Sequence, residues 1–263
     1  MADEAPRPLA GMHAVVTGGS RGIGRAIAAH LASLGASLTL LGRDRAHLDE
    51  AVHALAADST ACDAQTCDVR DEASVADAFA NIARTGHRVS VLVNNAGQAS
   101  SAKFADTDRA LWDAMIGVNL TGVYHCTRAA LPPLLAAPAG RVVNVASTAG
   151  LTGYPYVAAY CAAKHGVIGL TRALARELAG TRVTVNAVCP GYTDTDLVAE
   201  AVASIVERTG RTSEEARAAL AAHNPQRRLI RAEEVALAVG WLCLPQAGAM
   251  SGLALPVAGG EVA

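Results

Sequence analysis

The chain has 263 residues, of which 51% are hydrophobic, 3% aromatic and 17% charged, a composition that allows a large aliphatic core and excludes a disordered protein. A net charge of -2 and an isoelectric point near 6.4 give no reason to expect nucleic acid or an anionic membrane as a partner. No stretch of about 20 residues is continuously apolar, and the acidic N-terminus does not resemble a signal peptide. We therefore expect a cytoplasmic protein with a small-molecule partner.

Short apolar segments alternate along the chain with longer helical patterns, as in βαβ units. The expected strands span residues 12–17, 37–41, 61–67, 89–93, 141–146, 182–188 and 252–258. Since no linker, repeat or low-complexity tract divides the chain, these elements predict one α/β domain with a doubly wound, seven-stranded parallel sheet flanked by helices on both faces. The six cysteines form no CxxC pair and no zinc-like spacing with histidine, so we expect free thiols and no metal site.

Two helical regions are marked by the residues that end them. Apolar residues recur at spacings of three and four from Ile23 to Leu34, and Gly35 is suited to end that helix. Residues 194–230 are longer than a crossover needs and contain two helical patterns separated at Gly210. We expect this region to form a helical substrate lid beside the carboxyl ends of the strands.

The segment TGGSRGIG, at residues 17–24, lies between the first expected strand and the first expected helix. Glycines there allow a tight turn, a close approach of the backbone to a phosphate and close helix packing, and the helix N-terminus adds free N–H donors. This context predicts a Rossmann-type dinucleotide site rather than a purely structural turn. Its expected contacts are Gly18, Ser20, Ile23 and Gly24.

The second strand ends in LLGRDR, where an NAD-specific enzyme would place an acidic residue on the adenosine ribose. A glycine occupies that place, while Arg43 and Arg21 of the glycine loop suit the 2′-phosphate of NADP. We therefore favour NADP(H) over NAD(H). The alternative is that Arg43 is a solvated surface residue and Asp44 serves NAD. The adenine is expected to lie against Asp68 and Val69, after the third strand.

Further motifs follow in order: NNAG at 94–97, Asn119 in VNLTGV, Ser147 in NVAST, Tyr160 with Lys164 in YCAAK, and PGYTDT at 190–195. Together with TGGSRGIG, they make the chain resemble the short-chain dehydrogenase/reductases, in the single-domain branch. The resemblance covers essentially the whole chain and is greatest to 3-oxoacyl reductases and polyketide ketoreductases.

In that family, a tyrosine exchanges a proton with the substrate oxygen while the nicotinamide exchanges a hydride with the substrate carbon, and the resemblance assigns this tyrosine role to Tyr160. Readiness at neutral pH requires the pKa of the phenol to fall by about three units, or about 4 kcal/mol. Lys164 stands one helical turn away, in a chain with only two lysines among its 22 basic residues. Its ammonium, together with the oxidised nicotinamide, is expected to lower that pKa and to bond the ribose hydroxyls.

The resemblance assigns supporting roles to two further side chains. It implies that Ser147 polarises the substrate carbonyl; the structural alternative is a cap at the end of a strand. It also implies that Asn119 marks a distorted helix whose free carbonyl holds a water of a proton relay; the alternative is a buried structural asparagine.

The resemblance also implies that the NNAG loop, which begins at Asn94, passes over the adenosine ribose and that the turn after the sixth strand flanks the nicotinamide. The expected cofactor-binding residues in these two segments are Asn95, Ala96, Gly97, Pro190, Gly191 and Thr193, besides Tyr160 and Lys164. The expected substrate-binding residues are Gln98, Ser147, Tyr154 and Tyr192.

Most side chains expected around the substrate are small or apolar, which favours an uncharged or acyl-chain-like carbonyl. We expect an oxidoreductase that interconverts a ketone and a secondary alcohol, similar to reductases of 3-oxoacyl thioesters carried by acyl carrier protein or coenzyme A. The alternatives are an enzyme for a free secondary alcohol or cyclic ketone and, more distantly, a non-catalytic dinucleotide-sensing protein. The resemblance also implies a homotetramer.

Overall fold

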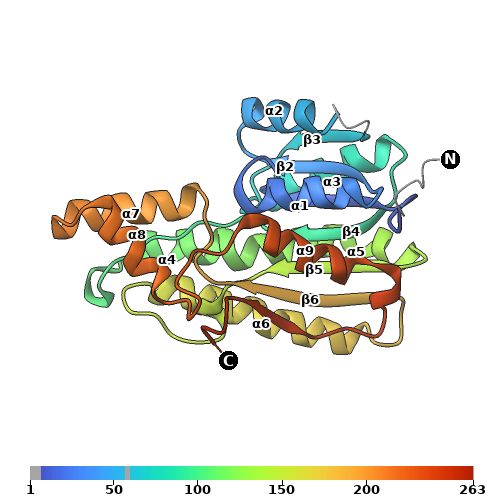
Figure 1. Cartoon of the computed structure of the whole chain (residues 1–263). Helices are drawn as coiled ribbons and strands as arrows, with labels where there is room; N and C mark the ends of the chain where they lie inside the picture. Colours follow the sequence, from blue (N-terminus) through green and yellow to red (C-terminus); the bar gives the residue numbers. More distant parts are fainter. Residues whose placement is uncertain (1–6, 57–59, 263) are drawn as a thin grey trace.

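The computed structural model describes residues 7–56 and 60–262. In that part of the chain, seven strands form one parallel sheet in the order β3-β2-β1-β4-β5-β6-β7 (Figure 1). The strands are β1 (His13–Thr17), β2 (Ser37–Gly42), β3 (Cys62–Thr66), β4 (Val89–Asn94), β5 (Gly140–Val145), β6 (Val183–Pro190) and β7 (Ala254–Val257). Their ends differ from the expected ones by at most two residues, so the prediction of a doubly wound parallel sheet is confirmed.

Helices cover both faces of this sheet (Figure 1). One face carries α1 (Gly22–Ser33), α2 (Arg45–Ala56) and α9 (Ala232–Cys243). The other carries α3 (Glu72–Arg84), α5 (Gly122–Ala136) and α6 (Ala158–Glu177). On β1, Ala14 and Val16 face the first core and Val15 faces the second. Because both faces are buried, the middle of the strand, residues 14–16, is continuously apolar rather than alternating with polar residues, and the polar ends His13 and Thr17 are also buried.

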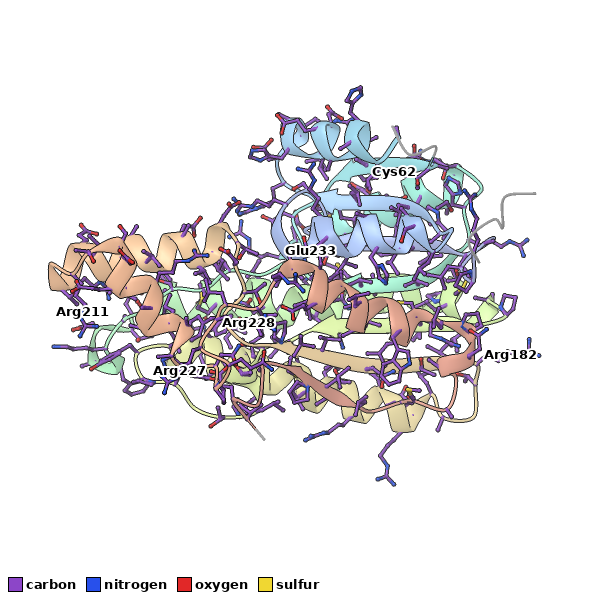
Figure 2. All side chains as sticks on the ribbon, viewed as in Figure 1. Cys62, Arg182, Arg211, Arg227, Arg228 and Glu233 are labelled. Carbon is purple, nitrogen blue, oxygen red and sulfur yellow. The ribbon has the colours of Figure 1, made fainter. Side chains whose placement is uncertain are left out.

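Two helices project from one end of the molecule as α7 (Asp196–Thr209) and α8 (Ser213–Ala221) (Figure 1). Gly210 ends α7 in the left-handed region, with φ at +70°. Thr212 then opens α8, because its hydroxyl accepts the backbone N–H of Glu215 at 3.2 Å while the Glu215 carboxylate accepts the N–H of Thr212 at 2.9 Å. The expected pair of helices within residues 194–230 is therefore confirmed, and Figure 2 shows Arg211 at their tip.

The helix α4 (Arg109–Ile116) runs into α5 through a π-helical turn at residues 117–121. No helix of the described residues is long and apolar enough to cross a lipid bilayer. All six cysteines are free thiols, and Cys62, on the edge strand β3, lies far from the two projecting helices (Figure 2).

Candidate active site

The side chains of Tyr160 and Lys164 lie on one face of α6, beside the carboxyl end of β5. Lys164 is only 4% exposed, and its Nζ donates to the carbonyl oxygen of Val145, the last residue of β5, at 2.9 Å. The same Nζ lies 5.6 Å from the centroid of the Tyr160 ring. Ser147 follows β5 by two residues; its hydroxyl accepts the N–H of Ala149 at 3.1 Å and lies near enough to Tyr160 to act on the pKa of that phenol. The fold thus gathers three of the side chains to which the sequence assigns the reaction.

The pKa of Tyr160 moves in the direction opposite to the fall that the sequence predicts. Burial raises the pKa of Tyr160 to about 12, and the Ser147 hydroxyl opposes that shift only in part. Burial also lowers the pKa of Lys164 to about 8. Because burial is the largest influence on this phenol, the chain alone does not supply the expected fall in the pKa of Tyr160. The remaining expected influence on this pKa is the positive charge of an oxidised nicotinamide.

Asn119 lies in the π-helical turn between α4 and α5 and is fully buried. Its Nδ2 donates to the carbonyl oxygens of Gln98 and Met115 at 2.9 and 3.0 Å, and its Oδ1 accepts the N–H of Gln98 at 3.3 Å. A Cβ at Gly97 would lie 2.9 Å from this Oδ1 and 3.8 Å from Nζ of Lys164, so the loop approaches both side chains closely. The expected helix distortion at Asn119 is present, whereas a water relay there stays a prediction.

The glycine loop has a backbone shape that fits a bound pyrophosphate. Gly18 adopts φ of +62°, and a Cβ at Gly24 would overlap the carbonyl oxygen of Gly18 and the side-chain amide of Asn95. At the start of α1, Arg21 makes no side-chain cap, so the first N–H groups of the helix are free to donate to an anion. These features suit a dinucleotide. Two further expected contacts, both half-buried, lie in the same loop: Ser20 and Ile23.

The NNAG loop is tied to the glycine loop by Thr17, a residue that the sequence argument overlooked. The hydroxyl of Thr17 accepts the backbone N–H groups of Asn95 and Ala96 at 2.9 and 3.0 Å. The Asn95 side chain donates to the carbonyl oxygen of Gly18 at 3.1 Å, and the buried Asn94 donates to the side chain of a β5 residue at 2.9 Å. Thr17 is the first residue of the TGGSRGIG segment, so its position in that motif could have indicated that it links the two loops.

The charged residues expected at the adenosine end have different surroundings. Nη1 of Arg21 lies 3.6 Å from the carboxylate of Asp196, at the start of α7, and both side chains are exposed. Arg43 is exposed directly after β2. Asp44 caps α2, because its Oδ1 accepts the N–H of His47 at 3.1 Å and its Oδ2 lies 3.3 Å from His47 Nδ1. The acid that would serve NAD in the alternative interpretation is therefore engaged at a helix end.

The expected adenine contacts are partly engaged by neighbours. The guanidinium of Arg70 pairs with the Asp68 carboxylate at 2.6 Å and lowers the pKa of Asp68. Val69 is 7% exposed, its side chain packs against Gly122 of α5, and its carbonyl oxygen lies 3.0 Å from Nδ1 of His125. The side chain of Val69 therefore belongs to the packing of α5, its carbonyl oxygen is engaged by His125, and a contact of Val69 with adenine stays a prediction.

β6 ends at Pro190, and the turn that follows carries Gly191 and Thr193. The hydroxyl of Thr193, which is 4% exposed, donates to the carbonyl oxygen of Gly191 at 3.0 Å. Thr193 also forms a parallel β-bridge with Ile230, so the segment after α8 holds this turn in place. A bond from Thr193 to a nicotinamide carboxamide would have to share or replace its bond to Gly191.

An aromatic cluster lies beside this turn. The ring centroids of Tyr154 and Tyr192 are 6.4 Å apart, and His223, just after α8, lies 5.3 Å from Tyr192. The phenol of Tyr154 donates to Oε1 of Glu261 at 2.5 Å and lies 2.9 Å from the hydroxyl of Thr148. Burial and Glu261 raise the pKa of Tyr154, so it stays protonated. No sequence motif pointed to His223 or Glu261.

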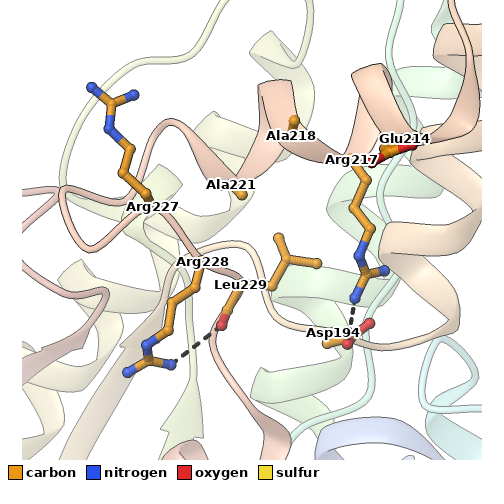
Figure 3. Close-up of a pocket in the computed structure, with 8 residues that line it drawn as sticks. All are labelled: Asp194, Glu214, Arg217, Ala218, Ala221, Arg227, Arg228 and Leu229. Atoms are coloured by element: carbon orange, nitrogen blue, oxygen red, sulfur yellow. Dashed lines mark hydrogen bonds and ion pairs between the residues drawn. The ribbon is translucent and has the colours of Figure 1, made fainter.

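The two projecting helices are tied to both sides of the site. Arg208, near the end of α7, donates to the carbonyl oxygen of Ser101 at 3.2 Å, in the loop that also contains Gln98. The Gln98 side chain donates to the backbone of α4 at 3.3 Å. A pocket of about 440 Å³ lies at the base of α8, where Arg217 pairs with Asp194 at 2.5 Å (Figure 3). This ion pair joins α8 to the turn after β6.

Comparisons with known proteins agree with this geometry. The model of a family described as short chain dehydrogenase matches residues 12–205. A Streptomyces virginiae protein named as a ketoacyl reductase of the monensin polyketide synthase is 41% identical over 250 residues, which cover 94% of this chain and 95% of that protein. D-beta-hydroxybutyrate dehydrogenase of Rhizobium meliloti (strain 1021) is 36% identical, with 95% and 98% covered. A crystal structure of an actinorhodin polyketide ketoreductase variant with NADPH has a TM-score of 0.92 and 36% identity, and the match covers 100% of this chain and 99% of that one.

Proposed function

Since the chain belongs to the short-chain dehydrogenase/reductase family and is an oxidoreductase that interconverts ketones and secondary alcohols, we propose that its substrate is a 3-oxoacyl thioester. The thioester would be carried by acyl carrier protein or coenzyme A. The observation that supports this proposal most directly is the cluster of Ser147, Tyr160 and Lys164 beside a glycine loop, in a chain 41% identical to a protein named as a ketoacyl reductase.

When bound, the nicotinamide exchanges a hydride with the carbonyl carbon of the substrate. Ser147 donates a hydrogen bond to the carbonyl oxygen, and Tyr160 gives its proton to that oxygen during reduction. The raised pKa of Tyr160 keeps the phenol protonated at neutral pH, which suits the direction of ketone reduction. Lys164 holds the ribose and returns a proton toward Tyr160, with Asn119 placed to connect this path to solvent through water.

The substrate is tested by assaying the purified enzyme with acetoacetyl thioesters and with simple cyclic ketones, each in the presence of NADPH and of NADH. We expect the thioesters to give the higher kcat/KM, because the relatives named above include ketoacyl and polyketide reductases. Turnover restricted to cyclic ketones or free secondary alcohols would overturn the thioester proposal and support the alternative enzyme class.

We also propose that the enzyme prefers NADP(H), with Arg43 and Arg21 near the 2′-phosphate. Replacing Arg43 with Ala is expected to lower kcat/KM for NADPH about tenfold or more, because a charge-assisted hydrogen bond contributes about 1.5–3 kcal/mol. NADH, which lacks the phosphate, is expected to change little. Arg45→Ala is the matched control, since Arg45 is exposed on α2 and pairs with Asp49 at 2.8 Å. Equal losses with both cofactors would contradict this placement of Arg43.

The assembly that we propose is a cytoplasmic homotetramer. Large apolar side chains are exposed on two separate surfaces: Leu237, Trp241 and Leu253 beside the edge strand β7, and Trp112, Tyr124 and Leu135 on α4 and α5. Two self-complementary surfaces are what a tetramer with crossed twofold axes needs. Light scattering is expected to give four times the chain mass at micromolar concentration, and a stable monomer would contradict the proposal.

A further inference from the structure

We propose that Glu261 is a specificity-determining residue whose carboxylate excludes ketones that carry a free carboxylate, and so directs the enzyme to neutral 3-oxoacyl derivatives. This inference rests on the proposed ketone-reducing site and names what that site rejects. The relatives described above are named for substrates of both kinds: the Rhizobium meliloti protein for a free hydroxy acid and the Streptomyces virginiae protein for a ketoacyl substrate.

The C-terminal segment turns back onto the site immediately after β7. Gly259 and Gly260 adopt φ values of +60° and +95°, a backbone conformation that is unfavourable for residues other than glycine. A Cβ at Gly259 would overlap the side chain of the buried Asn224, so the segment lies tightly against the turn after α8. The half-buried side chain of Glu261 is thereby fixed at the wall of the site.

The Glu261 carboxylate contacts two segments of the expected site, one through Tyr154 and the other at Gly191. Its Oε1 accepts a hydrogen bond from the phenol of Tyr154. The oxygen of this phenol also lies 2.9 Å from the hydroxyl of Thr148, which follows Ser147 in the chain. A Cβ at Gly191 would lie 2.6 Å from its Oε2, so the carboxylate packs against the turn expected to flank the nicotinamide. Glu261 therefore packs directly against the turn expected to flank the nicotinamide and is linked through Tyr154 to the segment that contains Ser147 and Thr148.

The negative charge of Glu261 has no cationic partner in the part of the chain that the structure describes, since every ion pair there joins other residues. The side chains that share this wall are neutral phenols and an imidazole. Like charges repel strongly in a partly desolvated site, where the effective dielectric constant is well below that of water. A substrate carboxylate in this wall would meet a fixed negative charge without a compensating cation.

The test compares two substrates that share one acyl group: acetoacetate, which is an anion, and its neutral N-acetylcysteamine thioester. Both are assayed with NADPH at pH 8, above the ordinary titration range of histidine. In Glu261→Gln, the amide keeps an acceptor for Tyr154 but loses the charge. We expect the ratio of kcat/KM for the thioester to that for acetoacetate to fall about tenfold in this variant, since about 1.4 kcal/mol of repulsion corresponds to a factor of ten.

The matched control is Glu50→Gln, which removes an exposed glutamate on α2 and is expected to leave the ratio unchanged. Inhibition of thioester reduction by acetoacetate supplies a second measurement, with a Ki that we expect to fall about tenfold in Glu261→Gln. An unchanged ratio and an unchanged Ki would overturn the role of Glu261 while leaving ketone reduction intact. If the wild-type enzyme reduces neither compound, the proposed thioester substrate fails first, and the inference about Glu261 falls with it.

Discussion

Replacing Tyr160 with Phe is expected to lower kcat by about a thousandfold, within the range that a positioned acid or base contributes. The ring of the variant fills the same space on α6, where the ammonium of Lys164 lies 5.6 Å from its centroid, so the packing of this helix face is retained. What is lost is the proton that the phenol gives to the substrate oxygen. We therefore expect cofactor affinity to persist while hydride transfer, measured in a single turnover by loss of reduced nicotinamide, becomes slow.

The control for this variant is Tyr124→Phe, because Tyr124 is exposed on α5, where its phenol accepts a hydrogen bond from Arg128 at 3.3 Å and its ring lies 5.5 Å from that of His125. Its turnover should match that of the unchanged enzyme. A Tyr160→Phe enzyme with full activity would contradict the catalytic assignment. If neither form reduced any ketone while both bound the cofactor, the non-catalytic dinucleotide-sensing alternative would be favoured instead.

The sequence predicts the sheet well because both of its faces are buried. Strands such as β1 and β4 then carry apolar residues side by side in their middles, at residues 14–16 and 91–93, and such runs are visible without a structure. Glycines with obligatory conformations were equally informative: Gly35 has φ of +96° and Gly210 of +70°, and both were expected at helix ends. Local backbone requirements of this kind depend on one or two residues, so they can be read from the chain directly.

Contacts between distant segments could not be predicted in the same way. Thr17 bonds a loop 78 residues further along the chain, and Glu261 meets Tyr154 across 107 residues. No short-range pattern in the sequence marks either of these contacts. The direction of the pKa shift of Tyr160 also depended on burial, which only the packed structure provides. The residue types indicated the chemistry of the site, but the electrostatic environment of those residues could be known only from the folded structure.

Replacing Lys164 with Met is expected to lower kcat/KM by about a hundredfold or more, because the variant keeps the length of the side chain but loses its proton and its ribose contact. Lys164→Arg should not restore activity. Lys164 is 4% exposed and its Nζ donates to the carbonyl oxygen of Val145 at 2.9 Å, so a longer, planar guanidinium cannot take the same position without displacing its neighbours. Steady-state rates with varied NADPH would separate the loss of cofactor binding from the loss of turnover.

The same substitution is expected to make the cofactor-free protein more stable, which distinguishes a catalytic lysine from a structural one. Burial lowers the pKa of Lys164 from 10.5 to about 8, so the unfolded chain binds this proton more tightly than the folded chain does. Stability therefore rises between pH 8 and 10.5, and below pH 8 the charged lysine costs about 3 kcal/mol relative to its neutral form, at about 1.36 kcal/mol per pH unit. Methionine removes that cost and forfeits one hydrogen bond to Val145, worth about 1 kcal/mol. Thermal unfolding at pH 7 should show a higher Tm for Lys164→Met, and the difference should shrink by pH 10. A lower Tm at pH 7 would mean that the ammonium stabilises the fold, and its burial would then need no functional explanation.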